Sequence, residues 1–212
     1  MGPILGLKRR GIMRREQIYD LTLTAMFLAI ILVMAFVPYL GFIPSPFIPG
    51  VSLTLIHIPV IIGGIILGRK KSWLLGTFFG LMSLVLAFLR HQGPVDEIFR
   101  NPLVSVLPRI IFGIVIFEIY NLLSKLIKVK AVNVAITMVV SSLIHTLLVI
   151  VMLYLFGKDT LVSLKIVPEN VAGNVIKVIG IFMSMSGLIE AGLALLIGTP
   201  TTTTLLVYSE NR

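Results

Sequence analysis

The sequence predicts an all-α membrane protein, a bundle of six transmembrane helices with both termini in the cytoplasm, from three observations. Hydrophobic residues fill 57% of the 212 positions and charged residues only 13%, with a mean hydropathy of +1.06. A soluble domain of this size needs a more polar surface. Apolar runs of about bilayer-crossing length recur along the chain, and basic residues cluster between them. We therefore expect one integral membrane domain over residues 1–212 and no soluble domain.

Six apolar runs are the candidate spans, since a transmembrane helix needs about 20 predominantly apolar residues. They are Leu21–Tyr39, Leu53–Gly68, Trp73–Leu89, Leu103–Leu123, Ala131–Phe156 and Val175–Gly198. The second is short, and the fifth is the clearest. We expect a basic cytoplasmic N-terminus over 1–19, the six-helix bundle over 20–200 and a cytoplasmic tail over 201–212. The first run is too long for a cleavable signal peptide and lacks a small-residue cleavage site.

The distribution of Lys and Arg predicts the orientation. With the N-terminus inside, two thirds of the 18 Lys and Arg residues fall on the cytoplasmic side, and the inside connections between spans are short and purely basic, as the positive-inside rule requires. These are Lys8, Arg9, Arg10, Arg14, Arg15, Arg69, Lys70, Lys71, Lys125, Lys128, Lys130 and Arg212. The basic residues that give the net charge of +9 therefore indicate how the chain is oriented in a lipid bilayer, and we expect no nucleic-acid partner.

The predicted outer loops are long, whereas the inner segment Arg69–Ser72 is expected to be a tight turn. The outer loops are Pro38–Ser52, Arg90–Pro102 and Gly157–Asn174. The first contains four prolines, which fix φ and limit loop entropy, so it is expected to form a shaped lid. The alternative is that these prolines only end helices.

Several chemistries are excluded or disfavoured by composition. The chain has no Cys, which excludes disulfides, Cys-based metal sites and thiol catalysis. It has no P-loop, so we expect no ATP hydrolysis by this chain. No internal repeat is evident, which disfavours a transporter that works alone. We expect no catalytic residues, no metal and no cofactor in this chain.

Ionisable residues inside the spans are costly and are therefore the first candidates for a binding site. Arg109, one turn into the fourth span, is expected to grip a carboxylate, although a snorkelling or internally paired Arg is the alternative. His145 lies in the middle of the fifth span, where it shares a polar face with Ser142. The alternative for this pair is hydrogen bonding that only holds helices together. With no second His or carboxylate at ligand spacing in the sequence, His145 is not expected to bind a metal.

Polar residues at the outer ends of the spans are secondary candidates. Asn101 and Asn174 offer a donor and an acceptor to a ligand, but helix capping is the alternative for both. Gln92 in the outer loop Arg90–Pro102 is expected to close over a ligand, with ordinary loop polarity as the alternative. Glu118 and Glu190 are placed too close to the cytoplasmic ends of their spans for ligand contact, and His57 is expected to be structural.

The pattern as a whole resembles the substrate-binding S component of an energy-coupling factor (ECF) vitamin transporter. The resemblance covers nearly the whole chain and rests on the six spans with cytoplasmic termini, the segment Ala25-Met26-Phe27-Leu28-Ala29 and the proline-rich first outer loop. It also rests on Leu55–Gly68 with the basic segment after it, on Asn101–Arg109 and on Ser142–Thr146.

The resemblance implies a vitamin-binding subunit in a prokaryotic plasma membrane. Its pocket would lie in the outer halves of spans four to six under the three outer loops. Ala25 and Ala29 would meet a membrane-embedded T component, and two ATPases would supply the energy. Ser105–Arg109 and His145-Thr146 look most like pantothenate-specific members, in which Arg109 would hold the carboxylate. Few aromatic residues are expected at the pocket, which disfavours flavin.

Other functions stay open at this stage. Pyridoxine, a thiamin precursor or folate are alternative ligands. An intramembrane enzyme would need a converged acid/base or metal set, for which His57, Glu118, His145 and Glu190 show no regular spacing. An assembly subunit without a ligand is the third alternative.

Overall fold

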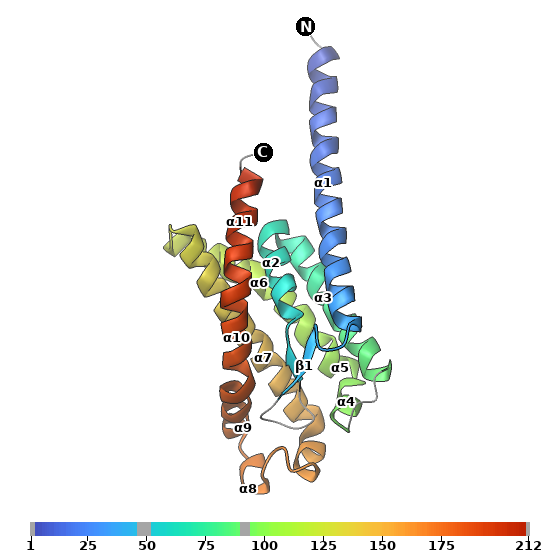
Figure 1. Cartoon of the computed structure of the whole chain (residues 1–212), viewed down its shortest axis with the longest axis vertical. Coiled ribbons are helices and arrows are strands. Elements are labelled where there is room, and N and C mark those ends of the chain that lie inside the picture. The colour runs from blue at the N-terminus through green and yellow to red at the C-terminus, as the bar shows by residue number, and fades with distance from the viewer. Residues whose placement is uncertain (1–2, 46–51, 90–93, 211–212) are drawn as a thin grey trace.

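The chain folds into a helical bundle with one small two-stranded hairpin, described here from a computed structural model (Figure 1). The structure describes the backbone of residues 3–45, 52–89 and 94–210 and the side chains of residues 17–45, 52–89 and 95–209. Five helical segments in these ranges are long and apolar enough to cross a membrane: Gln17–Phe36, Arg69–Leu89, Pro102–Leu126, Lys130–Ser163 and Val175–Ser209. The predicted all-α membrane fold class is confirmed at this level.

The elements follow one another in an up-and-down order, and both ends of the described chain lie at the same end of the bundle (Figure 1). In chain order they are α1 (Pro3–Phe36), β1 (Phe42–Pro44), β2 (Ser52–Thr54), α2 (His57–Leu67), α3 (Arg69–Leu89), α4 (Pro94–Phe99), α5 (Pro102–Ser105), α6 (Leu107–Leu126), α7 (Lys130–Ser163), α8 (Glu169–Ala172), α9 (Val175–Phe182), the π-helical turn η1 (Met183–Gly187), α10 (Leu188–Leu193), the π-helical turn η2 (Ala194–Gly198) and α11 (Thr199–Glu210).

The second predicted span differs most from the structure. Only 11 residues, His57–Leu67, are helical, and the residues before them form strand β2, which pairs antiparallel with β1 so that Phe42 lies opposite Thr54. The basic segment is not a tight turn: Gly68 alone ends α2 with a φ of 82°, and Arg69 already begins α3. A positive φ favours glycine because it has no Cβ.

The predicted outer loops contain helices, and the last span is longer than expected. Helix α7 continues to Ser163, α4 lies within the predicted loop Arg90–Pro102, and α8 lies within the predicted loop Gly157–Asn174. These short helices lie at the end of the bundle opposite the termini (Figure 1). The last span runs as one helical segment from Val175 to Glu210 through two π-helical turns. Much of the predicted tail over 201–212 is therefore helical. Residues 46–51 of the predicted lid lie outside the described residues.

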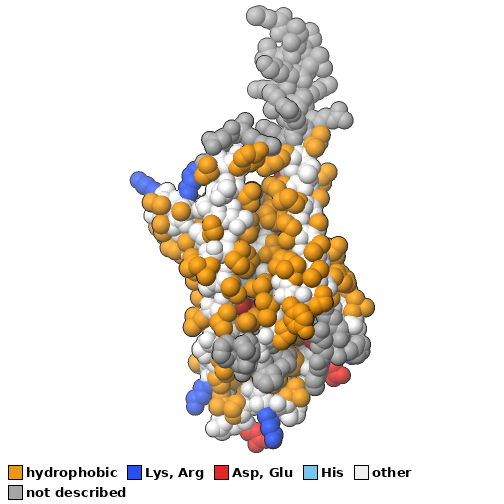
Figure 2. Space-filling model, viewed as in Figure 1, with side chains coloured by type: hydrophobic (Ala, Val, Ile, Leu, Met, Phe, Trp, Pro, Cys, Tyr) orange, Lys and Arg blue, Asp and Glu red, His pale blue; other side chains and the backbone are white. Residues whose placement is uncertain are grey.

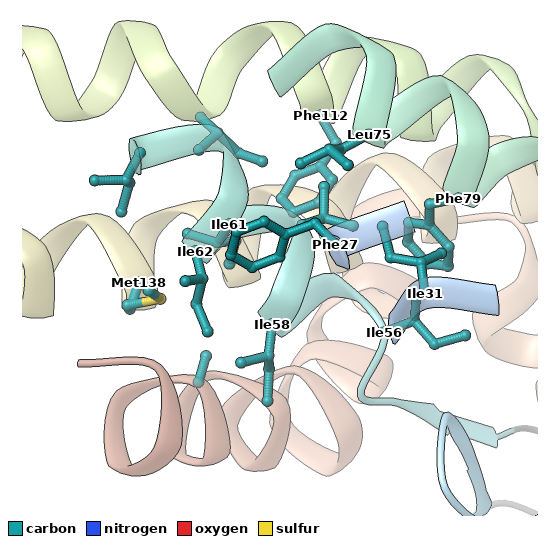
Figure 3. Packing of buried hydrophobic residues seen from close by; sticks show 14 of the residues in the cluster. Phe27, Ile31, Ile56, Ile58, Ile61, Ile62, Leu75, Phe79, Phe112 and Met138 are labelled. Carbon is teal, nitrogen blue, oxygen red and sulfur yellow. The ribbon is translucent and has the colours of Figure 1, made fainter. Parts of the chain in front are cut away.

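Helix α2 is the centre of the main hydrophobic core (Figure 3). Its residues from His57 to Ile65 are all buried, as expected for a helix that is apolar on every side. Around it pack side chains from α1, α3, α6 and α7, including Phe27, Leu75, Phe112 and Met138. The core therefore lies between the long helices, and α2 does not need bilayer-crossing length to be buried.

A second hydrophobic cluster lies towards the end of the bundle that holds the short helices. It joins α4, α7 and the start of α9 through residues such as Val95, Ile98, Leu153 and Val178. On the outside, hydrophobic side chains dominate the middle of the molecule, while Lys and Arg side chains gather near its two ends (Figure 2). This banded surface is the one that a bilayer requires.

Candidate ligand-binding cavity

A cavity of about 130 Å³ lies inside the bundle, and its lining includes members of both hydrophobic clusters. Helices α3, α4, α6, α7, α9 and α10, the turn η1 and the hairpin all contribute to its wall. Phe42, Ser52 and Thr54 come from the hairpin, which therefore covers one side of the cavity. The polar residues of the wall include Thr54, Arg109, His145, Thr146, Ser186 and Glu190.

Arg109 is held rigidly at the cavity wall by neutral groups. It is only 2% exposed and lies in the first turn of α6, directly after Pro108, which suits the start of a helix because it has no N–H to pair. Its Nη1 donates to the carbonyl oxygen of Val104 at 2.7 Å. Its guanidinium lies over the rings of Phe79 and Phe99, at 5.6 Å and 5.4 Å from their centroids. Its Nε has no hydrogen-bond partner among the described residues, which leaves a donor for a ligand.

His145 is buried among rings, yet both of its ring nitrogens are without hydrogen-bond partners among the described residues. Its ring stacks on that of His57, with centroids 5.3 Å apart and planes within 8°. Phe79 and Phe112 lie at 5.5 Å and 4.9 Å. A buried polar group without a partner is costly and calls for an explanation. A ligand in the cavity that His145 lines would supply the missing hydrogen bonds.

Glu190 connects the cavity wall to the hairpin. One carboxylate oxygen, Oε1, accepts from the backbone N–H of Thr54 at 2.6 Å, and the other, Oε2, accepts from the hydroxyl of Thr146 at 2.6 Å. The carbonyl oxygen of Thr54 in turn lies 2.6 Å from Nδ1 of His57. Because a carbonyl only accepts, Nδ1 carries the proton, and the neutral ring then accepts from Ser142 through Nε2, 3.0 Å away.

His57, His145 and Glu190 come close enough to be considered as metal ligands, with one candidate atom of each within 4.8 Å of the others. The three residues are far apart in the sequence, so their spacing along the chain gives no sign of this cluster. The geometry nevertheless favours a hydrogen-bond network. The two rings are parallel, so one ion cannot lie in both ring planes, where the nitrogen lone pairs point. The prediction that the chain holds no metal stays a prediction.

The structure brings two of the six predicted ligand residues to the cavity. Arg109 and His145 both line it, and whether they bind a ligand stays a prediction. Ser142 lies behind this wall, against His57. The side chains of Asn101 and Asn174 cap α5 and α9 by accepting from backbone N–H groups, so the capping alternative describes their positions and the structure does not bring them to the cavity.

The remaining predicted residues lie elsewhere or cannot be placed. Gln92 lies outside the described residues. Ala25 and Ala29, the predicted partner-contacting residues, are exposed on α1. Glu118 pairs with Arg69 of the basic segment at 2.6 Å and does not line the cavity.

Sequence reasoning missed three features of the cavity. Glu190 was placed near the cytoplasmic end of its span, but the helical segment continues to Glu210, so Glu190 lies near the middle. A carboxylate inside an apolar span is energetically costly and for that reason indicates a functional role. This signal should have outweighed the predicted position of Glu190 near the cytoplasmic end of its span. Ser186 lies in η1, and no sequence signal predicts that turn. Phe42, Phe99 and Phe182 line the cavity, so the expectation of few aromatic residues is wrong.

Comparisons with known proteins agree with the resemblance noted in the sequence. The family described as ECF transporter, substrate-specific component matches residues 19–200. The pantothenate transporter PanT of Leuconostoc mesenteroides is 35% identical over 102 residues, which cover 48% of this chain and 50% of that protein. The pantothenic acid transporter PanT of Lactococcus lactis is 28% identical over 162 residues, which cover 70% of this chain and 79% of that protein. The first of these matches therefore spans half the length of the relative.

Proposed function

Because this chain belongs to the family of ECF transporter substrate-specific components, we propose that it binds pantothenate in the cavity beside Arg109 and delivers it to an ATP-driven transporter in the cell membrane. Pantothenate has a carboxylate at one end, an amide in the middle and hydroxyl groups at the other end. The two pantothenate transporters to which the chain is similar support this choice of vitamin.

The observation that carries the proposal is a set of buried polar atoms around one cavity that find no hydrogen-bond partner in the described part of the chain. They are Nε of Arg109, both ring nitrogens of His145 and Oγ of Ser186. A carboxylate on the guanidinium and hydroxyl or amide groups near His145 and Ser186 would satisfy all of them. An empty apolar cavity would need none of these side chains.

The size of the cavity and the position of Arg109 favour this vitamin over the alternatives. A volume of about 130 Å³ is small for a ligand site and therefore suits a compact vitamin better than the larger fused-ring vitamins flavin and folate. The apolar wall, which includes Leu86, Ile150 and Leu153, suits the dimethyl-substituted carbon of pantothenate. Arg109 favours an anion, whereas pyridoxine and thiamin precursors carry no carboxylate.

The experiment that tests the ligand is purification without added vitamin, followed by mass spectrometry of what the protein carries and thermal unfolding with added vitamins. Saturating pantothenate, at about 100 times Kd, should stabilise the protein by about 2.7 kcal/mol, which raises Tm by roughly 5–10 °C. Panthenol, in which a hydroxymethyl group replaces the carboxylate, is the matched control and should give a much smaller shift. A large shift with pyridoxine, a thiamin precursor or folate, and none with pantothenate, would contradict the choice of vitamin.

We further propose a T component and two ATPases as partners, with Ala25 and Ala29 on the contact surface. Their small, exposed side chains permit close approach of another helix. Ala25→Leu and Ala29→Leu should leave pantothenate binding unchanged and abolish uptake in cells. The control is Leu188→Trp, at a side chain that is 60% exposed on α10, which should leave both unchanged. Normal copurification of the Ala variants with the T component would remove these residues from the interface.

A further inference from the structure

We propose that Glu190 is the positioning residue that latches the hairpin β1–β2 over the cavity, so that its hydrogen bond to Thr54 sets how fast the hairpin opens and how long the ligand stays bound. The inference rests on the proposed function for the ligand, but the latch itself is defined by protein atoms alone.

The latch holds one residue of the hairpin from two sides. The N–H of Thr54 donates to Glu190, which lies 136 positions later in the chain, and the carbonyl oxygen of Thr54 is bound by His57. The side chain of Thr54 itself lines the cavity. Both backbone polar groups at the inner edge of the hairpin are thus tied to the bundle.

The other contacts of the hairpin indicate where it would pivot. The N–H of Leu55 donates to the carbonyl oxygen of Gly41 at 2.8 Å. A Cβ at Gly41 would collide with Met34 and Ile56, so the base of the hairpin is packed tightly against the end of α1. With the base fixed by packing, opening would break the hydrogen bond between Thr54 and Glu190, which joins the hairpin to the last helix.

The chemistry of Glu190 favours a functional latch over a stabilising contact. It is 4% exposed, and burying a carboxylate is costly even when it is hydrogen-bonded. A neutral side chain would accept from Thr54 at lower cost, but a charged acceptor makes the stronger bond. Thr146 occupies the second oxygen and so fixes the orientation of the carboxylate towards the hairpin.

Glu190 also lies beside the groups that would hold the ligand. It lines the same cavity as Arg109 and His145, and one of its oxygens lies within 4.8 Å of a ring nitrogen of His145. A ligand that fills the cavity therefore packs against the latch and the hairpin together. Binding of a ligand in the cavity and closure of the hairpin are therefore coupled through the side chain of Glu190.

The test measures hairpin opening directly with a single introduced thiol. The chain has no Cys, so Leu53→Cys adds one thiol on β2, at a side chain that is 6% exposed and outside the cavity lining, where a ligand cannot shield it by contact. In the ligand-free protein, Glu190→Ala should raise the rate of maleimide labelling by about 10- to 100-fold, as expected from the loss of a hydrogen bond to a charged group. Glu190→Gln keeps a neutral acceptor and should raise it only several-fold.

The matched control is Glu118→Ala, which removes a carboxylate that is bound to Arg69 and does not line the cavity; it should leave the labelling rate unchanged. The dissociation rate of pantothenate should rise in the same order, with Gln below Ala. If Glu190→Ala does not fold, as judged by thermal unfolding, the Gln variant carries the test.

Two outcomes separate the latch from the choice of vitamin. If the Glu190 variants are labelled at the same rate as the parent protein, the latch is overturned even if pantothenate binding is lost, because Glu190 then only contacts the ligand. Faster labelling without any pantothenate binding to the parent protein supports the latch and overturns the choice of vitamin.

Discussion

The Arg109 guanidinium is oriented by a carbonyl oxygen and two aromatic faces. These neutral contacts fix the direction of the charge, and Asp96 and Glu190 are carboxylates that line the same cavity. In the low dielectric of the bundle interior, a ligand carboxylate that reaches this group gains much more than it would at the surface. The geometry therefore suits recognition of an anion better than it suits stabilisation of the empty protein.

Arg109→Lys tests this recognition at the scale of one residue. Lys keeps the charge but cannot form the paired, planar hydrogen bonds of a guanidinium, so we expect Kd for pantothenate to rise about 10- to 100-fold. The affinity for panthenol, which lacks the carboxylate, should change by less than about 3-fold, because only the contact to a charged partner is lost. Isothermal titration of both ligands measures the two effects, and equal losses for both would show that the substitution acts on the shape of the site instead.

Helices α3 and α6 position Arg109 through a close crossing of glycines. A Cβ on Gly76 would lie 2.5 Å from the carbonyl oxygen of Arg109 and 2.7 Å from Cα of Gly113. Ser72 adds a hydrogen bond to the carbonyl oxygen of Gly113 across the same crossing, at 2.5 Å. Small residues allow helix backbones to approach in a membrane, where packing and hydrogen bonds take the place of the hydrophobic effect. The placement of the cavity wall therefore depends on this crossing.

Gly76→Ala is expected to separate α3 from α6 and to destabilise the protein by about 1–3 kcal/mol. Since the new methyl group would press on the backbone of Arg109, the affinity for pantothenate should also fall. Gly192→Ala is the matched control, because a Cβ there meets no atom within 4 Å, and both properties should stay unchanged. Thermal unfolding and titration measure the pair of variants. A Gly76→Ala protein as stable as the Gly192→Ala protein would disprove the tight crossing.

The π-helical turn η1 is a second element that shapes the site. It contains Ser186, and it lies between Phe182 and Glu190, all of which line the cavity. A π turn widens the helix by one residue and changes the direction of the side chains around it, and such turns are frequent at functional sites. Which side chains of the last helical segment face the cavity therefore depends on this π-helical turn as well as on residue spacing.

At the scale of the whole molecule, the long helices run antiparallel to one another, so different connections lie at the two ends of the bundle. The α6–α7 connection lies at the same end as the termini, α8 lies at the other end, and the hairpin lies between them (Figure 1). The basic residues of the sequence predict that the first end is cytoplasmic. A cavity that lies towards the opposite end would then accept its ligand from outside the cell.

A pair of thiol substitutions tests this orientation. Ser124→Cys near the end of α6 and Ser163→Cys at the end of α7 both replace an exposed serine that only hydrogen-bonds its own helix. In intact cells, a membrane-impermeant maleimide should label the second and not the first, because only the outer end is reachable. Permeabilised cells, in which both should react, provide the control. Labelling of Ser124→Cys alone in intact cells would reverse the topology.

The amino-acid sequence by itself determined the fold class and singled out Arg109 and His145 as costly polar residues in apolar surroundings. These properties are local: hydropathy, charge bias and the penalty for an ionisable side chain in a span depend on a residue and its near neighbours. The same reasoning failed for the second span, because a helix of 11 residues can be buried by other helices without crossing a bilayer.

Only the tertiary structure decided which polar groups meet. Thr54 and Glu190 are far apart in the chain, and their hydrogen bond depends on the length of the last helix, on its π-helical turns and on a hairpin in place of predicted helix. Asn101 and Asn174 have side chains that can bind a polar ligand, but these side chains cap the N-termini of neighbouring helices instead. Convergence on a cavity is a property of packing, which fixes the depth and rotation of every helix at once, and neither quantity is encoded in residue spacing alone.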